Sequence, residues 1–306
     1  MAEIFSALAP VFLLILLGYL IRSRGLIAET FWVSAEKMTY FLFFPALLLG
    51  NTATARIGGL DVAPMIAASV VAVLLVAALA GLLRPRLALS GPSYTSVFQA
   101  FMRPNVYLGI AAAYALYGQA GLTLVSVSVA VLVPLVNVLG VVVLVRHAGV
   151  EGAPPSWGKA LGPIARNPLI IACTLGALLN VSELGLPPLV EPFLEILGRA
   201  ALPVGLLAVG AGLDLAALRS SGRLVGLTSC VKLLILPGLT YAACLVFGVT
   251  GLAVTISVLY ASLPNSATSY VLARQMGGDT ALLAGSITAS TLLAMVTMPL
   301  IAILLP

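Results

Sequence analysis

The 306-residue chain is 61% hydrophobic and only 8% charged, which is far too apolar for a water-soluble fold of this length. The composition therefore excludes a water-soluble protein and predicts an all-α integral membrane protein, because helices satisfy their own backbone hydrogen bonds in a lipid bilayer. A net charge of +5 would suggest a nucleic-acid partner for a soluble chain. Here the basic residues lie between apolar runs, as topology signals do, so we expect no nucleic-acid partner.

Apolar runs of about 20 residues, the length that crosses a bilayer, follow one another along the chain. The first run lacks a preceding basic segment and a cleavage site, so we interpret it as an uncleaved span and not as a signal peptide. The first five runs lie near 5–21, 33–50, 61–83, 94–118 and 122–145. After a short polar stretch, five more lie near 161–180, 193–213, 224–247, 251–275 and 281–304. The sequence predicts ten transmembrane helices.

The lysine and arginine residues indicate the orientation of these spans. Most of them lie in or beside the odd-numbered connections, whereas the even-numbered connections hold Arg56 and Arg199. The positive-inside rule therefore places the odd connections in the cytoplasm and both termini outside. The polar stretch 147–160 becomes a cytoplasmic linker in a multi-pass protein of the cell inner (plasma) membrane.

The two halves on either side of this linker, 1–146 and 161–306, match one another at a nearly constant spacing. The matched positions are Pro10 with Pro168, Gly18 with Gly176, Pro45 with Pro203, Pro104-Asn105 with Pro264-Asn265, and Gly118 with Gly278. Since each half holds an odd number of spans, the second half enters the membrane from the opposite side. The sequence predicts a 5+5 inverted repeat forming a single membrane domain. Chance alignment of prolines and glycines is the weaker explanation.

The two matched Pro-Asn pairs lie near the middle of spans 4 and 9. A proline there removes a backbone donor and crowds the preceding turn, so we expect helices 4 and 9 to be broken. Broken helices at membrane depth offer a positive N-terminal end to anions and carbonyl oxygens to cations. The symmetric pairs predict a transport site. The alternative is an ordinary proline kink packed by neighbouring side chains.

Two cations lie deep in apolar spans: Arg103, directly before the first of these prolines, and Lys232 in span 8. Every Asp and Glu lies at a span end or in a connection, so the sequence provides no carboxylate at the middle of the membrane. Buried cations without a resident acid favour a small organic anion, a mono- or dicarboxylate, as the substrate. The alternative is that each cation binds carbonyl oxygens at a helix end, or that it reaches Asp61 or Asp214.

Further polar side chains lie on the broken spans. We expect Tyr107 and Ser266 to join the two Pro-Asn pairs, Arg103 and Lys232 in binding the substrate. Ser262, Thr268 and Ser269 are candidates for binding a substrate or an ion, and helix-to-helix hydrogen bonding is an equal use for them.

We expect no enzyme activity, metal or organic cofactor, because no catalytic pair lies at the middle of the membrane. The single histidine, His147, lies in the cytoplasmic connection. Cys173, Cys230 and Cys244 lie in apolar stretches without metal-binding spacing, so we interpret them as small buried hydrophobic residues. Coupling to Na⁺, coupling to H⁺ and uniport of the anion all stay open.

Three stretches together resemble the auxin efflux carrier family of bacterial and plant transporters. They are "RPNVYLGIAAAYALYG" in span 4, "KLLILPGL" in span 8 and "LPNSATSYVLARQMGGDTALLAGSITASTLLAMVTMPL" in spans 9 and 10. The hydropathy match covers nearly the whole chain. The long hydrophilic loop that plant members insert between the halves is absent here.

This resemblance implies a ten-helix inverted-repeat carrier whose fourth and ninth helices cross at Pro104 and Pro264, with Asn105 as the crossover asparagine. It further implies secondary transport of a carboxylate or an auxin-like anion by alternating access of the elevator type, in a homodimer. A sodium-coupled symporter with the architecture of bile-acid symporters, or an anion channel, is kept as the alternative.

Overall fold

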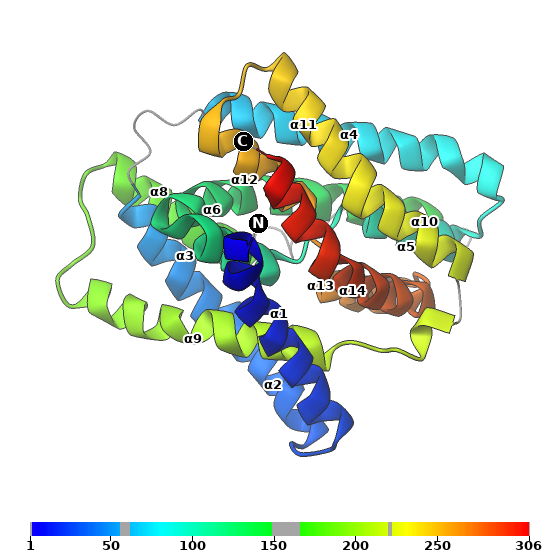
Figure 1. Cartoon of the computed structure of the whole chain (residues 1–306), viewed down its shortest axis with the longest axis horizontal. Helices are drawn as coiled ribbons and strands as arrows, with labels where there is room; N and C mark the ends of the chain where they lie inside the picture. Colours follow the sequence, from blue (N-terminus) through cyan, green and yellow to red (C-terminus); the bar gives the residue numbers. More distant parts are fainter. Residues whose placement is uncertain (1, 56–61, 149–165, 220–221, 306) are drawn as a thin grey trace. The chain divides into compact units, whose positions relative to one another are not determined.

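The computed structural model describes residues 2–55, 62–148, 166–219 and 222–305. In these ranges the chain is almost entirely helical, with one isolated pair of bridged extended residues and no strand (Figure 1). The predicted all-α class is confirmed. Beyond residue 148, the predicted linker 147–160 lies outside the described residues.

Figure 1 shows the helices in chain order. The first half contains α1 (Ala2–Ser23), α2 (Glu29–Met38), the π-helical turn η1 (Thr39–Phe43), α3 (Phe44–Ala53), α4 (Val62–Leu87), α5 (Gly91–Met102) and α6 (Val106–His147). The second half contains α8 (Pro168–Val181), α9 (Val190–Ala211), the short turn η2 (Ala217–Arg219), α10 (Gly222–Cys230), the π-helical turn η3 (Val231–Ile235), α11 (Leu236–Val246), α12 (Gly251–Ala261), α13 (Ala267–Met276) and α14 (Thr280–Leu304).

Several of these helical runs are long and apolar enough to cross a bilayer. In the described residues the six that meet both conditions are Glu3–Ser23, Val62–Leu87, Val106–His147, Val190–Ala211, Gly222–Val246 and Thr280–Leu304. The shorter helices Pro168–Val181 and Gly251–Ala261 are also apolar. All of them lie on runs predicted from the sequence, and the chain is a multi-pass membrane protein.

The run labelled α6 consists of two helices joined at Gly118. Gly118 has φ 54° and ψ −142°, a conformation that a residue with a Cβ rarely adopts. At 1.5 Å per residue, 42 helical residues would extend about 60 Å, roughly twice the thickness of a bilayer core. The break at Gly118 falls where the sequence predicts the boundary between the spans at 94–118 and 122–145.

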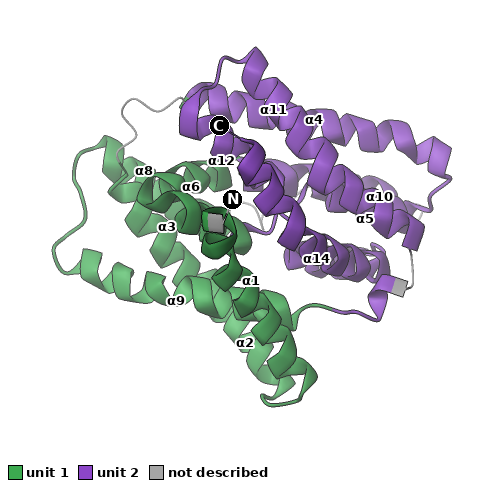
Figure 2. Ribbon diagram, viewed as in Figure 1, with its two compact units in different colours: residues 1–62, 107–131, 165–213 green, residues 63–106, 132–164, 214–306 purple. Residues whose placement is uncertain are grey.

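The chain forms two compact units, and each takes segments from both halves of the sequence (Figure 2). Unit 1 comprises Met1–Val62, Tyr107–Val131 and Ala165–Leu213. Unit 2 comprises Ala63–Val106, Leu132–Ile164 and Asp214–Pro306. The boundary after residue 62 lies at the start of α4, and the boundary after residue 213 lies between α9 and η2.

Helix packing in unit 1 depends on glycines at the contacts of α9 with α1 and of α8 with α3. A Cβ atom added to Gly18 of α1 would lie 2.0 Å from the carbonyl oxygen of Leu207 in α9. One added to Gly210 of α9 would lie 1.8 Å from the carbonyl oxygen of Ile15. Lipid is as apolar as a leucine side chain, so helices in a membrane associate largely through such close backbone approaches. These glycines allow α1 and α9 to touch along their backbones.

The cysteines correct one expectation. Cys173 and Cys244 are buried, as predicted, but Cys230 at the end of α10 is exposed. The prediction for Cys230 is wrong because an apolar run in a membrane protein does not distinguish a side chain that faces the core from one that faces outward, where lipid is equally apolar.

We expect Gly210→Ala to lower the melting temperature of the purified protein in detergent by several degrees. The new methyl group would overlap the Ile15 carbonyl oxygen, and overpacking of this kind costs about 1–3 kcal/mol. Gly81→Ala in α4 is the matched control, because a Cβ there meets no atom within 4 Å. Its melting temperature should be unchanged or slightly higher, since alanine favours a helix. Equal melting temperatures for the two variants would contradict the α1 and α9 packing.

Candidate functional site

The helices of unit 2 are interrupted at both Pro-Asn pairs, as predicted. α5 ends at Met102 and the chain resumes a helix only at Val106, while α12 ends at Ala261 and α13 begins at Ala267. The two interruptions are joined to each other: the backbone N–H of Asn105 donates to the carbonyl oxygen of Pro264 at 2.8 Å. Pro104 and Asn265 form an antiparallel bridge. Backbone groups that the breaks release from their helices thereby find partners in one another.

The sequence around each break explains its local shape. Arg103 is extended, with φ −75° and ψ 113°, because a residue before proline is pushed out of the helical region. After the second break, the Ser266 hydroxyl oxygen accepts from the backbone N–H of Thr268 at 3.3 Å and so caps the start of α13. Each break is therefore short, and a new helix starts directly after it.

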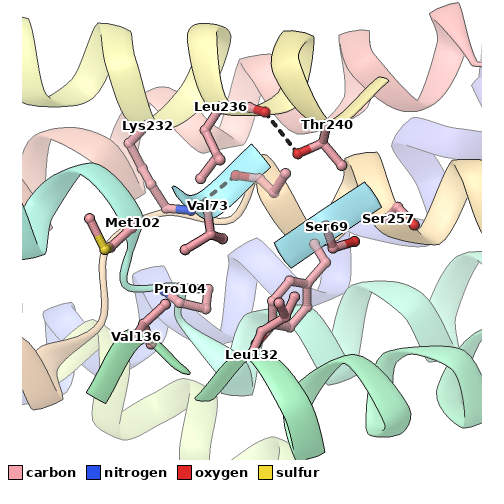
Figure 3. Close-up of a pocket in the computed structure, with 12 residues that line it drawn as sticks. Ser69, Val73, Met102, Pro104, Leu132, Val136, Lys232, Leu236, Thr240 and Ser257 are labelled. Carbon is pink, nitrogen blue, oxygen red and sulfur yellow. Dashed lines mark hydrogen bonds between the residues drawn. The ribbon is translucent and has the colours of Figure 1, made fainter. Parts of the chain in front are cut away.

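A cavity lies beside the interruptions, with walls from α4, α6, α12, the η3–α11 run and the chain around Pro104 (Figure 3). Its lining residues, all in unit 2, are Ser69, Val73, Met102, Pro104, Leu132, Val136, Lys232, Leu236, Thr240, Ser257, Tyr260 and Ala261. Its volume is about 20 Å³, room for one or two water molecules. No carboxylate is among these lining residues of the described chain.

Lys232 is fully buried in the wall of this cavity, and Figure 3 shows its side chain extending from η3 into it. Its ammonium nitrogen Nζ donates to the carbonyl oxygen of Ala261 at 2.9 Å. Ala261 is the last residue of α12, where the carbonyl oxygens lack partners within the helix and carry the negative end of its dipole. A contact of this kind, with a carbonyl oxygen at a helix end, is one of the alternatives that the sequence left open for Lys232.

Arg103 is buried as well, with 7% of its surface exposed. Its guanidinium donates to Gln99 Oε1 at 3.1 Å and also to Asn137 Oδ1. Arg103 does not line the cavity, although Pro104 next to it does. Sequence reasoning missed both partners, although each left a signal: Gln99 lies one helical turn before Arg103, and Asn137 is the one amide side chain in the apolar run 122–145.

Asn265 at the second break is fully buried. Its backbone N–H donates to the Ser290 hydroxyl at 3.0 Å, but neither atom of its side-chain amide has a hydrogen-bond partner among the described residues. Buried polar groups in proteins are nearly always paired, so the amide of Asn265 is unusual among the described residues.

Comparison with known proteins gives the family of the chain. A family model described as Membrane transport protein matches residues 3–302. The chain belongs to the Membrane transport protein family. The resemblance to auxin efflux carriers read from the sequence is therefore confirmed. A protein from Methanothermobacter thermautotrophicus described as an uncharacterized transporter is 26% identical over 311 residues, which cover 96% of this chain and 96% of the relative.

The remaining predicted site residues of this membrane transport protein have local partners. The hydroxyl of Ser262 donates to Leu259 O at 2.7 Å, that of Ser269 donates to Ser266 O at 2.5 Å, and those of Ser266 and Thr268 are 2.9 Å apart. These hydroxyls shape the turns at the second break, and none is among the lining residues of the cavity. Tyr107 belongs to unit 1, where its ring stacks on Phe44 with centroids 4.3 Å apart.

The amide of Asn265 gives a stability prediction for this membrane transport protein. We expect Asn265→Leu to raise the melting temperature or leave it unchanged, because the leucine has a similar size and removes two buried polar atoms without partners. Asn137→Leu is the matched control. It should lower the melting temperature, because the buried Arg103 guanidinium loses an acceptor, at a cost of about 1–3 kcal/mol. Equal losses of stability in the two variants would show that the Asn265 amide is paired.

Proposed function

We propose that this transporter is a secondary carrier that moves a small organic anion, a mono- or dicarboxylate, by alternating access at the interrupted helices of unit 2. The observation that carries the proposal is Lys232: a fully buried lysine in the wall of a cavity that has no carboxylate among its described lining residues. A cation at membrane depth is costly and marks a substrate or ion pathway. A carboxylate in the cavity would supply the missing negative charge.

The two breaks add binding groups for such an anion. α6 and α13 each begin directly after a break, so the N-terminal ends of both helices lie at the interruptions. The positive end of a helix dipole at these positions stabilises a carboxylate. Arg103 adds a second cation whose hydrogen bonds to Gln99 and Asn137 go to neutral oxygens.

The residues we assign to substrate binding share a place at or next to the breaks. In unit 2 they are Arg103, Pro104, Asn105, Pro264, Asn265, Ser266 and Lys232, with Ser262, Thr268 and Ser269 as further candidates for substrate or ion, and Tyr107 of unit 1 stays a prediction from the sequence.

The size of the cavity supports alternating access over a permanently open pore. The cavity has a volume of about 20 Å³, enough for water, and in the proposed cycle its lining helices move apart to admit a carboxylate. Each compact unit also draws on both halves of the sequence, which supports the ten-span inverted repeat. The same proposal includes four further features: crossing of the interrupted helices, movement of the elevator type, a homodimer, and an orientation with both termini outside.

A thermal-shift screen of the purified protein tests the substrate class. We expect at least one of acetate, malonate, succinate and indole-3-acetate, at fixed ionic strength and in sodium or choline salts, to raise the melting temperature by several degrees. A ligand at 100 times its Kd stabilises the folded state by about 2.7 kcal/mol. A shift that requires the sodium salt would favour the sodium-coupled alternative.

Variants and flux measurements make this test specific. Arg103→Gln and Lys232→Met should each raise at least tenfold the anion concentration that is needed for the same rise in melting temperature. Arg274→Gln, which removes an exposed cation of α13, should leave that concentration unchanged. In proteoliposomes the same anion should enter by a saturable route with competition among carboxylates. No shift with any anion, or an unsaturable ion current, would refute the carrier.

A further inference from the structure

Lys232 has only neutral neighbours in its cavity. Its described hydrogen-bond acceptor is the carbonyl oxygen of Ala261. The hydroxyls of Ser69, Thr240 and Ser257 each donate their hydrogen to the carbonyl oxygen four residues earlier in their own helix, at 2.9, 2.8 and 2.7 Å. Their oxygens therefore remain as acceptors toward the cavity, and none of them carries a charge.

The helices around Lys232 provide no carboxylate. η3 contacts α5, α10, α11 and α14, and the cavity adds α4, α6 and α12. The titratable or charged residues on these elements, with Arg103 at the end of α5, are Arg84, Arg86, Tyr94, Arg103, Tyr107, Tyr114, Tyr117, Arg146, His147, Arg223, Cys230, Tyr241, Cys244 and Tyr260. Among the described residues that line the cavity, Tyr260 is the one titratable residue besides Lys232.

The described carboxylates of unit 2 are Asp214 and Asp279, and both bind backbone elsewhere. Asp214 Oδ1 accepts from the N–H groups of Ala216 and Ala217. Asp279 Oδ1 accepts from the N–H of Leu282 at the start of α14, and its Oδ2 accepts from the hydroxyl of Ser93. Neither is available as a permanent counter-ion in the cavity.

The charge on Lys232 is therefore expected to depend on what occupies the cavity. Burial removes hydration from the ammonium of Lys232, and the neutral oxygens around it replace only part of that hydration. A carboxylate beside Nζ offsets this loss, because an opposite charge at close range favours the protonated form. Proton binding and anion binding then strengthen one another by the same factor.

We propose that Lys232 is the proton-coupling group of this carrier, so that one proton travels with each bound carboxylate. This inference rests on the proposed anion transport and adds its driving ion. A proton from the aqueous side forms an N–H bond to the neutral amine as the carboxylate binds. The same bond breaks when the carboxylate leaves, and the proton passes to water on the other side. The sequence has no carboxylate or histidine in mid-membrane for this task, and a lysine performs it here.

Titration calorimetry of the full chain in detergent measures how many protons the protein takes up for each anion that it binds. Acetate, malonate and succinate are titrated at one mildly alkaline pH in phosphate and in Tris, two buffers whose heats of ionisation differ widely. The difference in observed heat gives the number of protons taken up per anion. We expect wild type to take up about one proton with the carboxylate that binds.

Two substitutions at Lys232 make the result specific. Lys232→Arg keeps a permanent charge and should bind the carboxylate without proton uptake. Lys232→Met covers the case in which arginine does not fold, and it should bind at least tenfold more weakly, also without proton uptake. Arg274→Gln, at the exposed cation of α13, is the control and should behave as wild type.

The outcomes separate this inference from the proposed function. Anion binding by wild type without proton uptake would overturn the coupling role of Lys232 and leave the carrier in place. Proton uptake that persists in either folded Lys232 variant would overturn it as well, because the proton would then bind elsewhere. Failure of all three carboxylates to bind would refute the proposed anion transport and the coupling together.

Discussion

The hydrogen bond from Asn105 N–H to Pro264 O, together with the bridge between Pro104 and Asn265, is the contact on which the site depends. Unwound backbone inside a bilayer is stable only if its polar groups find partners, since no water is there to replace the helical ones. Each break supplies partners for the other. A short stretch of extended chain can therefore persist at membrane depth, and its helix ends become binding groups.

Lys232 follows from the same geometry. Ending α12 at Ala261 leaves carbonyl oxygens without helical partners, and the ammonium of Lys232 bonds to one of them. One neutral oxygen is weak compensation for a fully buried charge. In the proposed mechanism this position attracts a proton and an anion together. Arg103 differs in kind, because its guanidinium is always charged and is held by two amide oxygens, from Gln99 and Asn137.

Much of the fold is predictable from the sequence because hydropathy and proline act locally. The apolar runs coincide with helices, and both Pro-Asn pairs coincide with breaks, since a proline disrupts a helix whatever surrounds it. The face of the helix on which a side chain lies decides which residues it contacts. An apolar run does not reveal these faces, because positions that face lipid are as apolar as positions that face the protein core. Hence the sequence left the partner of Lys232 open and did not indicate the cavity hydroxyls of Ser69, Thr240 and Ser257. For the same reason, the burial predicted for Cys230 was wrong.

The most direct test of the account is a crystal structure of the purified protein with 3-bromopropionate, in which anomalous scattering locates the bromine. The account predicts a bromine peak in unit 2, in a widened cavity between Lys232 and Pro104, with the carboxylate beside the ammonium nitrogen of Lys232. A bromopropionate that binds saturably but gives its peak only outside unit 2, away from both Pro-Asn breaks, would contradict it.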